Sequence, residues 1–244
     1  MALDFDVQRA YRLQLEIARR VALHDAYDRI ETVAGVDVAY TRTSRGGEVG
    51  FAIITLHEYP SLRLIDISVA RGQPPIPYIP GLLAFREAPL AYVALSRLTI
   101  QPDILIVDGH GYAHPRKAGI ATHLGVALDK PSIGVAKKRL TGRECLHHGK
   151  LGLCDENGRL LAFIIEHGRT HLYVSPGHRI SHESAYKLVK NMLRGRAKLP
   201  IPTYTADKLS KTAKRLIECR AGSIEECRRK LEEEATKIIK NAKL

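Results

Sequence analysis

The chain has 244 residues, and its 38 lysines and arginines outnumber 26 aspartates and glutamates, so its formal net charge is +12. This length suits one globular domain with at most a small appendage, and an apolar fraction of 45% excludes a disordered chain. No stretch approaches the roughly 18 apolar residues that span a bilayer. The positive charge favours a polyanionic partner such as nucleic acid, although a basic protein without such a partner is an equal alternative on charge alone.

The N-terminus and the cysteines indicate the cellular compartment of the protein. Residues 1–20 contain Asp4 and Asp6 and lack the basic-then-apolar layout of a secretory signal, so we expect no export. No CxxC pair occurs, and we predict no disulfide framework and a reducing, cytoplasmic location. The chain has four cysteines, Cys145, Cys154, Cys219 and Cys227. Asparagine and glutamine total only seven residues, which favours a heat-adapted source.

The first third of the chain predicts a helix and three strands. Apolar positions spaced among charges over residues 5–22 indicate the helix. Short apolar runs over 32–40, 49–59 and 62–70 predict strands, and the short turns between them make these strands antiparallel neighbours. Residues 72–81 hold four of the twelve prolines and predict a stiff loop.

The middle of the chain alternates helices and strands. We predict a helix from about 84 to 98, in which Pro89 is tolerated if it lies in the first turn. A strand over 103–109, a helix over 116–130 and a strand over 131–138 follow. The order predicts an α/β fold whose mixed sheet has three antiparallel strands and then parallel strands with right-handed crossover helices.

The last third predicts a hairpin and two helices. Strands over 151–155 and 159–166 flank a tight turn and form the hairpin. A helix is expected near 182–193. The terminal helix over 223–242 begins with a capping box in which Ser223 is the N-cap.

Carboxylates at strand positions are candidate metal ligands. Asp37 interrupts an apolar strand, which is unfavourable unless a cation meets it, and Asp108 ends the 103–109 strand, where open α/β sheets place ligand sites. If the first and fourth strands are parallel neighbours, the two carboxylates lie side by side and repel each other unless a divalent cation separates them. Glu87 could complete the set. Oxygen ligands favour Mg²⁺ or Mn²⁺ over zinc, whereas each residue alone is more typical of a cap or turn.

Histidines are numerous but do not indicate zinc. His110 and His114 are four residues apart in a glycine-containing loop, and His167 and His171 lie beside a glycine. Helical i,i+4 geometry is therefore not assured, and no cysteine-rich spacing supports a structural zinc site.

Five segments, VAGVDVAY, PYIPGLLAFRE, DGHGYAHPRKAGIATHLG, SPGHRIS and PTYTAD, resemble the motifs of the endonuclease V family of deoxyinosine-directed repair nucleases. The similarity extends over about residues 5–215. It implies a ribonuclease H-like fold, in agreement with the predicted strand order, and divides the chain into a catalytic domain over 1–222 and a C-terminal helical extension over 223–244. The implied catalytic carboxylates and metal ligands are Asp37, Glu87 and Asp108, with Asp207 where the family has a further Asp or His.

The resemblance also implies chemistry. The expected reaction is Mg²⁺-dependent hydrolysis of the second phosphodiester bond 3′ to inosine, leaving a 3′-hydroxyl and a 5′-phosphate, with Mn²⁺ as a substitute metal. Lys137 matches a family lysine that could place or activate the water, with plain phosphate binding as the alternative. His114 and His123 match positions near the scissile phosphate, where they would be catalytic by steadying the pentacovalent charge, with structural capping or helix packing as the alternative.

Lesion recognition is implied for two further segments. The loop Pro77, Tyr78, Ile79 and Pro80 resembles the family's wedge, in which Tyr78 stacks into the space left by a rotated nucleotide; a packed surface loop is the alternative. Main-chain groups would read the extruded base at Gly81, Leu83, Gly119 and Ile120. Arg86 and Arg116 would serve phosphates or carboxylate positioning. Two basic clusters would extend the footprint or be solvated surfaces: Lys137, Lys138, Arg139 and Arg143, and Lys187, Lys190, Arg194, Arg196 and Lys198.

The sequence therefore predicts a monomeric, cytoplasmic, Mg²⁺-dependent endonuclease that acts on deoxyinosine-containing DNA in repair. We expect no association with a membrane. An inosine-specific endoribonuclease is a close alternative, because no residue is identified that would contact a 2′-hydroxyl. A non-catalytic nucleic-acid-binding protein on the same scaffold is a third hypothesis, which the complete carboxylate set disfavours.

Overall fold

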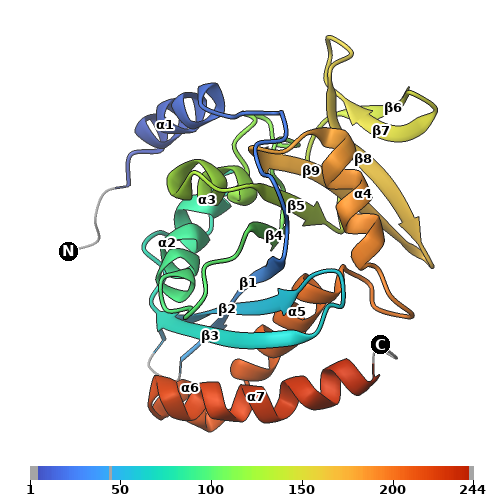
Figure 1. The fold of residues 1–244 in the computed structure, drawn as a ribbon. Coiled ribbons are helices and arrows are strands. Elements are labelled where there is room, and N and C mark those ends of the chain that lie inside the picture. The colour runs from blue at the N-terminus through green and yellow to red at the C-terminus, as the bar shows by residue number, and fades with distance from the viewer. Residues whose placement is uncertain (1–4, 44–45, 242–244) are drawn as a thin grey trace.

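The computed structural model describes residues 5–43 and 46–241, and these form a central sheet with helices on both faces (Figure 1). The strands are β1 (Thr32–Arg42), β2 (Glu48–Glu58), β3 (Leu64–Gly72), β4 (Ile104–Asp108), β5 (Ser132–Ala136), β6 (Arg143–His147), β7 (Lys150–Cys154), β8 (Leu160–His167) and β9 (Thr170–His178). The helices are α1 (Val7–Arg19), α2 (Leu83–Leu95), α3 (Ile120–Leu128), α4 (His182–Met192), α5 (Ile201–Ala213), α6 (Ile217–Ala221) and α7 (Ile224–Asn241).

The sheet order is β3-β2-β1-β4-β5-β9-β8-β7-β6. β1 pairs antiparallel with β2, and β2 with β3, whereas β1 and β4 are parallel, as are β4 and β5. The predicted mixed sheet and the parallel pairing of the first and fourth strands are confirmed. The hairpin of β7 and β8 is also confirmed, because these strands pair antiparallel.

Two layers of helices bury the sheet. Helices α2 and α3 pack on one face of β1, β2 and β4 through small residues such as Ala91, Ala94 and Ala121. On the other face, α5 and α7 pack against β2 and β3, where Leu209 and Leu231 meet Phe51. Helix α7 thus shares a core with the edge strand β3 and its neighbour β2. Its predicted N-cap is confirmed, since the Ser223 hydroxyl accepts a hydrogen bond from the Glu226 amide at 3.0 Å.

Several helix boundaries differ from the sequence prediction. α1 begins later than residue 5, after the N-cap Asp6, whose side chain accepts from the Arg9 amide. Pro89 lies beyond the first turn of α2, where its exposed ring is tolerated on the solvent side. α3 begins at Ile120 rather than 116, because Gly119 is an extended N-cap and Lys117 has a φ of 56°.

The expectation that the cysteines form no disulfides is wrong. Cys145 pairs with Cys154 across the β6–β7 hairpin, and Cys219 pairs with Cys227 between α6 and α7. The sequence prediction assigned neither β6 nor α6, so nothing brought the partners together. The inference of a reducing compartment loses this support. Over the described part of the chain, no helix is long and apolar enough to cross a membrane.

Candidate active site

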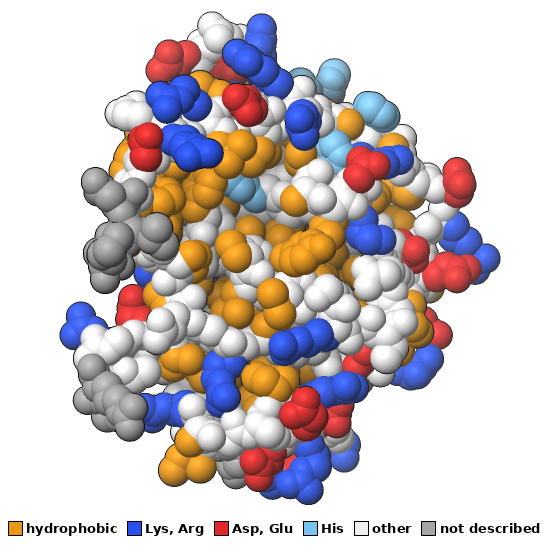
Figure 2. All heavy atoms as spheres, turned by 90° about the vertical axis from the view of Figure 1, so that its left-hand side faces the viewer, with side chains coloured by type: hydrophobic (Ala, Val, Ile, Leu, Met, Phe, Trp, Pro, Cys, Tyr) orange, Lys and Arg blue, Asp and Glu red, His pale blue; other side chains and the backbone are white. Residues whose placement is uncertain are grey.

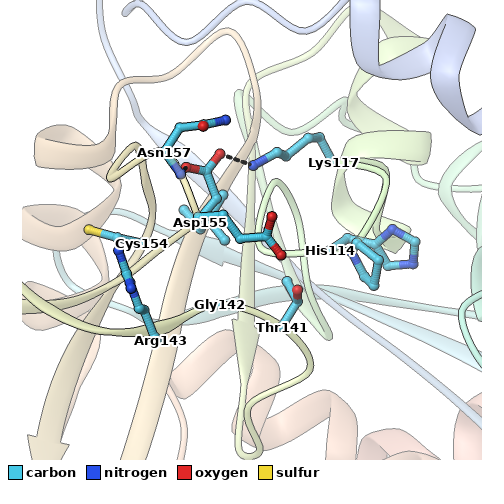
Figure 3. A pocket seen from close by; sticks show the side chains of 11 residues that line it. His114, Lys117, Thr141, Gly142, Arg143, Cys154, Asp155 and Asn157 are labelled. Carbon is cyan, nitrogen blue, oxygen red and sulfur yellow. Dashed lines mark hydrogen bonds and ion pairs between the residues drawn. The ribbon is translucent and has the colours of Figure 1, made fainter.

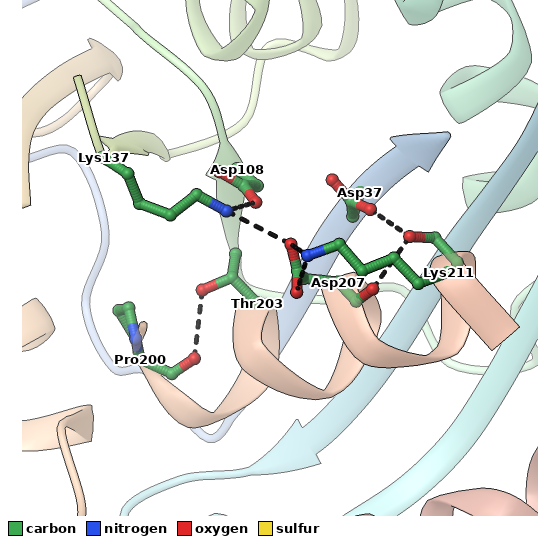
Figure 4. Close-up of polar contacts among 8 residues, drawn as sticks. Asp37, Asp108, Lys137, Pro200, Thr203, Asp207 and Lys211 are labelled. Carbon is green, nitrogen blue, oxygen red and sulfur yellow. Dashed lines mark hydrogen bonds and ion pairs between the residues drawn. The ribbon is translucent and has the colours of Figure 1, made fainter. Parts of the chain in front are cut away.

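Three carboxylates converge beside the parallel strand pair. Val36 of β1 lies opposite Val107 of β4, so Asp37 and Asp108 occupy the next position on adjacent strands. Asp207 reaches them from α5 (Figure 4). One oxygen from each carboxylate lies within 4.8 Å of the other two. The predicted juxtaposition of Asp37 and Asp108 therefore holds, and a third acidic side chain joins it.

Close packing of α5 on β1 places Asp207. A Cβ atom on Gly35 would come within 2.1 Å of the Pro202 carbonyl, so only a glycine permits this approach. The Thr55 hydroxyl donates to the Pro202 carbonyl oxygen at 2.8 Å. One turn beyond Asp207 lies Ser210, whose hydroxyl donates to the Asp37 carboxylate. Helix and strand are thus fixed to each other on both sides of the site.

Burial and mutual repulsion disfavour ionised carboxyls here. Burial, followed by the charge of Asp37, raises the pKa of Asp108 to about 7. Burial also raises the pKa of Asp37, against the hydrogen bond from Ser210. Glu87 on α2 lies outside the three-residue cluster but feels it, since burial and the charges of Asp37 and Asp108 raise its pKa to about 8. An acidic group of this kind is stabilised by a cation.

Two lysines provide cations at the site. Lys137, directly after β5, donates to Asp108 at 2.7 Å and to Asp207 at 3.2 Å. Lys211 donates to both oxygens of Asp207 at 2.7 Å. Despite burial, these contacts lower the pKa of Asp207. The charge and hydrogen bond of Asp108 raise the pKa of Lys137 against its burial, so Lys137 is a cationic hydrogen-bond donor at neutral pH.

The donor set fits a hard divalent cation. Carboxylate oxygens from two strands and a helix surround one point, and oxygen-only sites select Mg²⁺, Mn²⁺ or Ca²⁺ over softer metals. Burial and the charge of Asp37 raise the pKa of Asp108. A bound cation would offset both effects and favour the ionised carboxylate. The acidic cluster could therefore bind a metal ion.

A small cavity lies next to the carboxylates. It has a volume of about 150 Å³, and Gly109, the residue after Asp108, is part of its wall. Its lining brings together Tyr78, Gly81, Leu83, Ala84, Gly109, His110, His114, Ala118, Gly119, Ile120 and Leu140. Four of these, Gly81, Leu83, Gly119 and Ile120, are the positions to which the family resemblance assigns reading of the base, and Tyr78 is its wedge residue.

Within the segment from Pro77 to Pro80, Ile79 is anchored and the other three residues are open to solvent. Tyr78 is 67% exposed, and Pro77 and Pro80 are exposed too. Ile79 instead packs in a small apolar cluster with Leu82 and Ala10 of α1. The loop is thus held from behind while its aromatic tip faces solvent.

Arg86 and Arg116, expected from the sequence to serve phosphates or carboxylate positioning, are both engaged inside the protein. Arg86 is buried, pairs with Glu48 at 2.8 Å and stacks on the Tyr40 ring at 4.2 Å. Arg116 donates to the Gly81 carbonyl at 3.1 Å and to Gln14 at 2.5 Å. Both contacts favour a positioning role over phosphate binding.

Sequence reasoning missed Gln14. This buried side chain of α1 donates to the carbonyls of Gly81, at 2.9 Å, and Ala118, at 3.3 Å. It therefore ties together the two loops that line the small cavity. A single amide in a charged amphipathic helix carries no motif, although a buried glutamine is unusual.

The two candidate histidines are neutral and lie beside the carboxylate cluster rather than in it. His114 donates through Nε2 to the Gly81 carbonyl at 3.1 Å. His123 on α3 stacks edge-on against Phe85, and its Nε2 has no partner within the described residues. Burial lowers the pKa of each to about 4. Their contacts favour packing and loop support in this state.

Two wider hollows flank the cavity. One, of about 480 Å³, lies between the 114–117 loop and the β7–β8 turn, where Lys117 pairs with Asp155 at 2.8 Å and Arg143 is exposed (Figure 3). The other, of about 470 Å³, lies between α1, α2 and α3 and is lined by Phe85, Tyr92 and His123. Apolar side chains gather on this helical face, with basic and acidic side chains around them (Figure 2).

The sheet order and the carboxylates from β1, β4 and α5 define a nuclease of ribonuclease H-like fold. The chain belongs to the endonuclease V family, whose sequence model matches residues 15–208. It is 40% identical over 225 residues to the endonuclease V of Ignicoccus hospitalis, covering 88% of this chain and 99% of that one. Members of this family are endonucleases, hydrolases of phosphodiester bonds, and so is this protein.

Solved structures of endonuclease V share this fold. The endonuclease V of Bacillus subtilis superposes with a TM-score of 0.80 at 27% identity, covering 87% of this chain and 94% of that one. The endonuclease V of Ciona intestinalis, at 26% identity and a TM-score of 0.72, covers 85% and 98%. That protein was crystallised with a 24mer DNA containing an inosine followed by a ribo-adenosine.

Proposed function

We propose that this endonuclease recognises deoxyinosine in DNA and, with Mg²⁺, hydrolyses the second phosphodiester bond 3′ to it. The products are a 3′-hydroxyl and a 5′-phosphate, and the cellular role is repair of deaminated adenine. The observation that carries the proposal is the adjacency of two sites: Asp108 belongs to the acidic cluster and Gly109 to the small cavity. The inosine-containing DNA bound by the Ciona relative supports the choice of lesion.

Asp37, Asp108 and Asp207 would hold the metal, with Glu87 above them. Mg²⁺ held there would supply a Lewis acid for the phosphoryl group and the leaving oxygen. Lys137 donates a hydrogen bond to the phosphate or to the attacking water, since it is cationic and 2.7 Å from Asp108. His114 and His123 support the loop and helix that position these groups.

Recognition is assigned to the small cavity. The hypoxanthine base would rotate out of the helix, and Tyr78 would stack in the vacated space. Main-chain groups at Gly81, Leu83, Gly119 and Ile120 would pair with its edge. The amino group of guanine would lose its partner there. Gln14 and Arg116 hold the Gly81 carbonyl and so fix the geometry of this edge.

Domain limits, oligomeric state and location complete the proposal. The catalytic domain covers residues 1–222, and the helical extension over 223–244 lies past the matched segment of the family. The protein acts as a monomer in the cytoplasm.

The deciding experiment is cleavage of a labelled duplex that contains one deoxyinosine, with Mg²⁺ or with chelator. Wild-type protein should nick it at the second bond 3′ of the lesion in Mg²⁺ alone. Asp108→Asn should abolish nicking and retain binding, whereas the exposed control Asp28→Asn should behave as wild type. Nicking by Asp108→Asn at the wild-type rate would refute the assignment.

RNA is the second candidate substrate, because the DNA in the Ciona complex has a ribonucleotide after the inosine. Matched DNA and RNA strands with one inosine distinguish the two. Faster cleavage of the RNA under identical conditions would replace DNA repair with RNA processing as the function.

A further inference from the structure

A second charged feature lies beside the acidic cluster. It is a groove of about 740 Å³ between the end of β1, helix α5 with the turn after it, and α7. Its lining residues are Thr41, Lys208, Lys211, Thr212, Lys214, Arg215, Glu234 and Ile238. One wall therefore comes from the C-terminal extension, to which the family resemblance assigns no role.

The groove is strongly basic. Four of its eight lining side chains are cationic and one, Glu234, is acidic. Lys208 and Arg215 are exposed. Within the described part of the chain, no carboxylate forms an ion pair with Lys208 or Lys214. Glu234 is itself paired with Lys237 of the same helix at 2.6 Å. Lys211 is paired with Asp207, but Lys208 and Lys214 are cations of the groove that no carboxylate of the described residues neutralises.

The groove continues directly from the carboxylates. Thr41 is four residues after Asp37 on β1, and Lys211 is one turn after Asp207 and contacts it (Figure 4). Along α5, a rise of 1.5 Å per residue places the last residue, Ala213, about 9 Å from Asp207, and Lys214 and Arg215 follow in the turn beyond it. A stacked strand advances about 3.4 Å per nucleotide, so the helical part of the groove corresponds to about three nucleotides.

We propose that this groove binds the phosphate backbone of the nucleic acid beyond the bond that is cut, and that α7 forms part of the binding surface. The path to the acidic cluster rests on the proposed nuclease function, but the binding itself is independent of the lesion. Contacts of this kind add affinity and salt sensitivity without reading bases.

The test is the salt dependence of DNA binding, measured in chelator by fluorescence anisotropy with two duplexes of equal length, one containing deoxyinosine and one without it. The variant Lys214→Gln/Arg215→Gln should bind both duplexes on the order of tenfold to a hundredfold more weakly at 0.1 M salt. Its slope of log K against log salt should be shallower by about two.

The control variant removes the same amount of charge near the starts of β1 and β3, at the opposite end of β1 from the groove. Arg29→Gln/Arg63→Gln loses two cations that pair with Glu31 and Glu58, and it should match the wild-type slope. A groove variant whose affinity and slope equal those of this control would overturn the proposal.

A second variant tests the role of α7 separately, and its result does not depend on whether the Lys214→Gln/Arg215→Gln variant folds. Glu234→Gln removes the acidic residue of the groove and should tighten binding several-fold, whereas unchanged affinity would remove α7 from the surface. The two hypotheses fail differently. If the wild type neither nicks nor prefers inosine, the proposed function fails, yet the slope on plain DNA still decides the groove.

Discussion

Gly35 of β1 and Pro202 of α5 are in backbone contact, and a single added methyl group would come within 2.1 Å of the Pro202 carbonyl. Five residues further along α5 is Asp207, and two residues further along β1 is Asp37. The contact therefore sets the separation between a strand carboxylate and a helix carboxylate of the same site.

Gly35→Ala should move α5 away from the sheet. Overpacking of this kind lowers the free energy of unfolding by about 1–3 kcal/mol, and a displacement of Asp207 by about 1 Å should reduce kcat on the order of a hundredfold. Thermal unfolding and nicking rates measure the two effects. Gly47→Ala is the control, because among the described residues the added methyl meets the Thr43 hydroxyl at an ordinary contact distance of 3.5 Å. Wild-type kcat in Gly35→Ala would show that α5 does not set the site.

Tyr78→Ala should reduce lesion selectivity without destabilising the fold. The ring is 67% exposed, so unfolding should change by less than about 0.5 kcal/mol. Loss of stacking, worth about 1–3 kcal/mol, should lower the preference for inosine over adenine duplexes by roughly tenfold to a hundredfold. Tyr92→Ala, on α2 and 51% exposed, is the matched control. Unchanged selectivity with a lowered Tm would mean that Tyr78 serves packing instead.

Metal binding should stabilise the folded protein measurably. At a Mn²⁺ or Mg²⁺ concentration 100 times Kd, the gain is about 2.7 kcal/mol, or a rise in Tm of about 5–10 °C at this chain length. Asp108→Asn should lose this rise. Its metal-free Tm should be no lower than wild type, because it removes a buried charge beside Asp37. An equal metal-induced rise in the variant would place the metal elsewhere.

His57 should make stability pH-dependent. Burial lowers its pKa from 6.5 to about 4, while its Nδ1 donates to the Leu62 carbonyl at 2.9 Å. The unfolded chain therefore binds a proton below pH 6.5 that the folded protein resists. The contribution of His57 to the free energy of unfolding is fully present above pH 6.5. It is lost as the pH falls towards 4, by about 3 kcal/mol at most.

Chemical unfolding between pH 4 and 8 measures the effect. His57→Asn keeps a hydrogen-bond donor near Leu62. Its free energy of unfolding should fall less between pH 6.5 and pH 4 than that of the wild type. Other buried histidines, such as His182 with a pKa lowered to about 4, contribute equally to both proteins. Parallel curves would contradict the assignment to His57.

The Cys219–Cys227 disulfide should stabilise the α6–α7 segment. Closing a loop of this length is worth about 2–3 kcal/mol. Cys219→Ala/Cys227→Ala should have a lower Tm, and reductant should lower the Tm of the variant less than that of the wild type. Four free thiols in protein purified without reductant would contradict the pairing.

The sequence predicted the strand pair that carries Asp37 and Asp108 well, and the helix beside it poorly. Asp37 and Asp108 follow from apolar runs and strand order, because both lie in or directly after buried strands. Asp207 was placed by resemblance alone. Its segment is interrupted by prolines that argue against a helix, yet Pro200 and Pro202 lie at the N-cap and first turn of α5, where a missing amide costs little.

Strand β9 was missed for a related reason. Pro176 and Gly177 weaken the strand pattern, and the structure accommodates them beside a register shift between β5 and β9. The cavity could not be foreseen from local pattern either, because its walls come from loops more than 25 residues apart that Gln14 joins from a third segment. Such contacts are set by tertiary packing, to which local periodicity is insensitive.

Helix α5 has three different sides. Leu209 and Ala213 face the shared core, Asp207 and Ser210 face Asp37 and Asp108, and Lys208 and Thr212 face the groove. A saturation scan along this helix should therefore yield three classes of defect, in expression, turnover and DNA affinity, that recur every three to four positions. Laboratory evolution for tighter DNA binding has room on only one of these sides, since gains elsewhere would be offset by misfolding or lost chemistry.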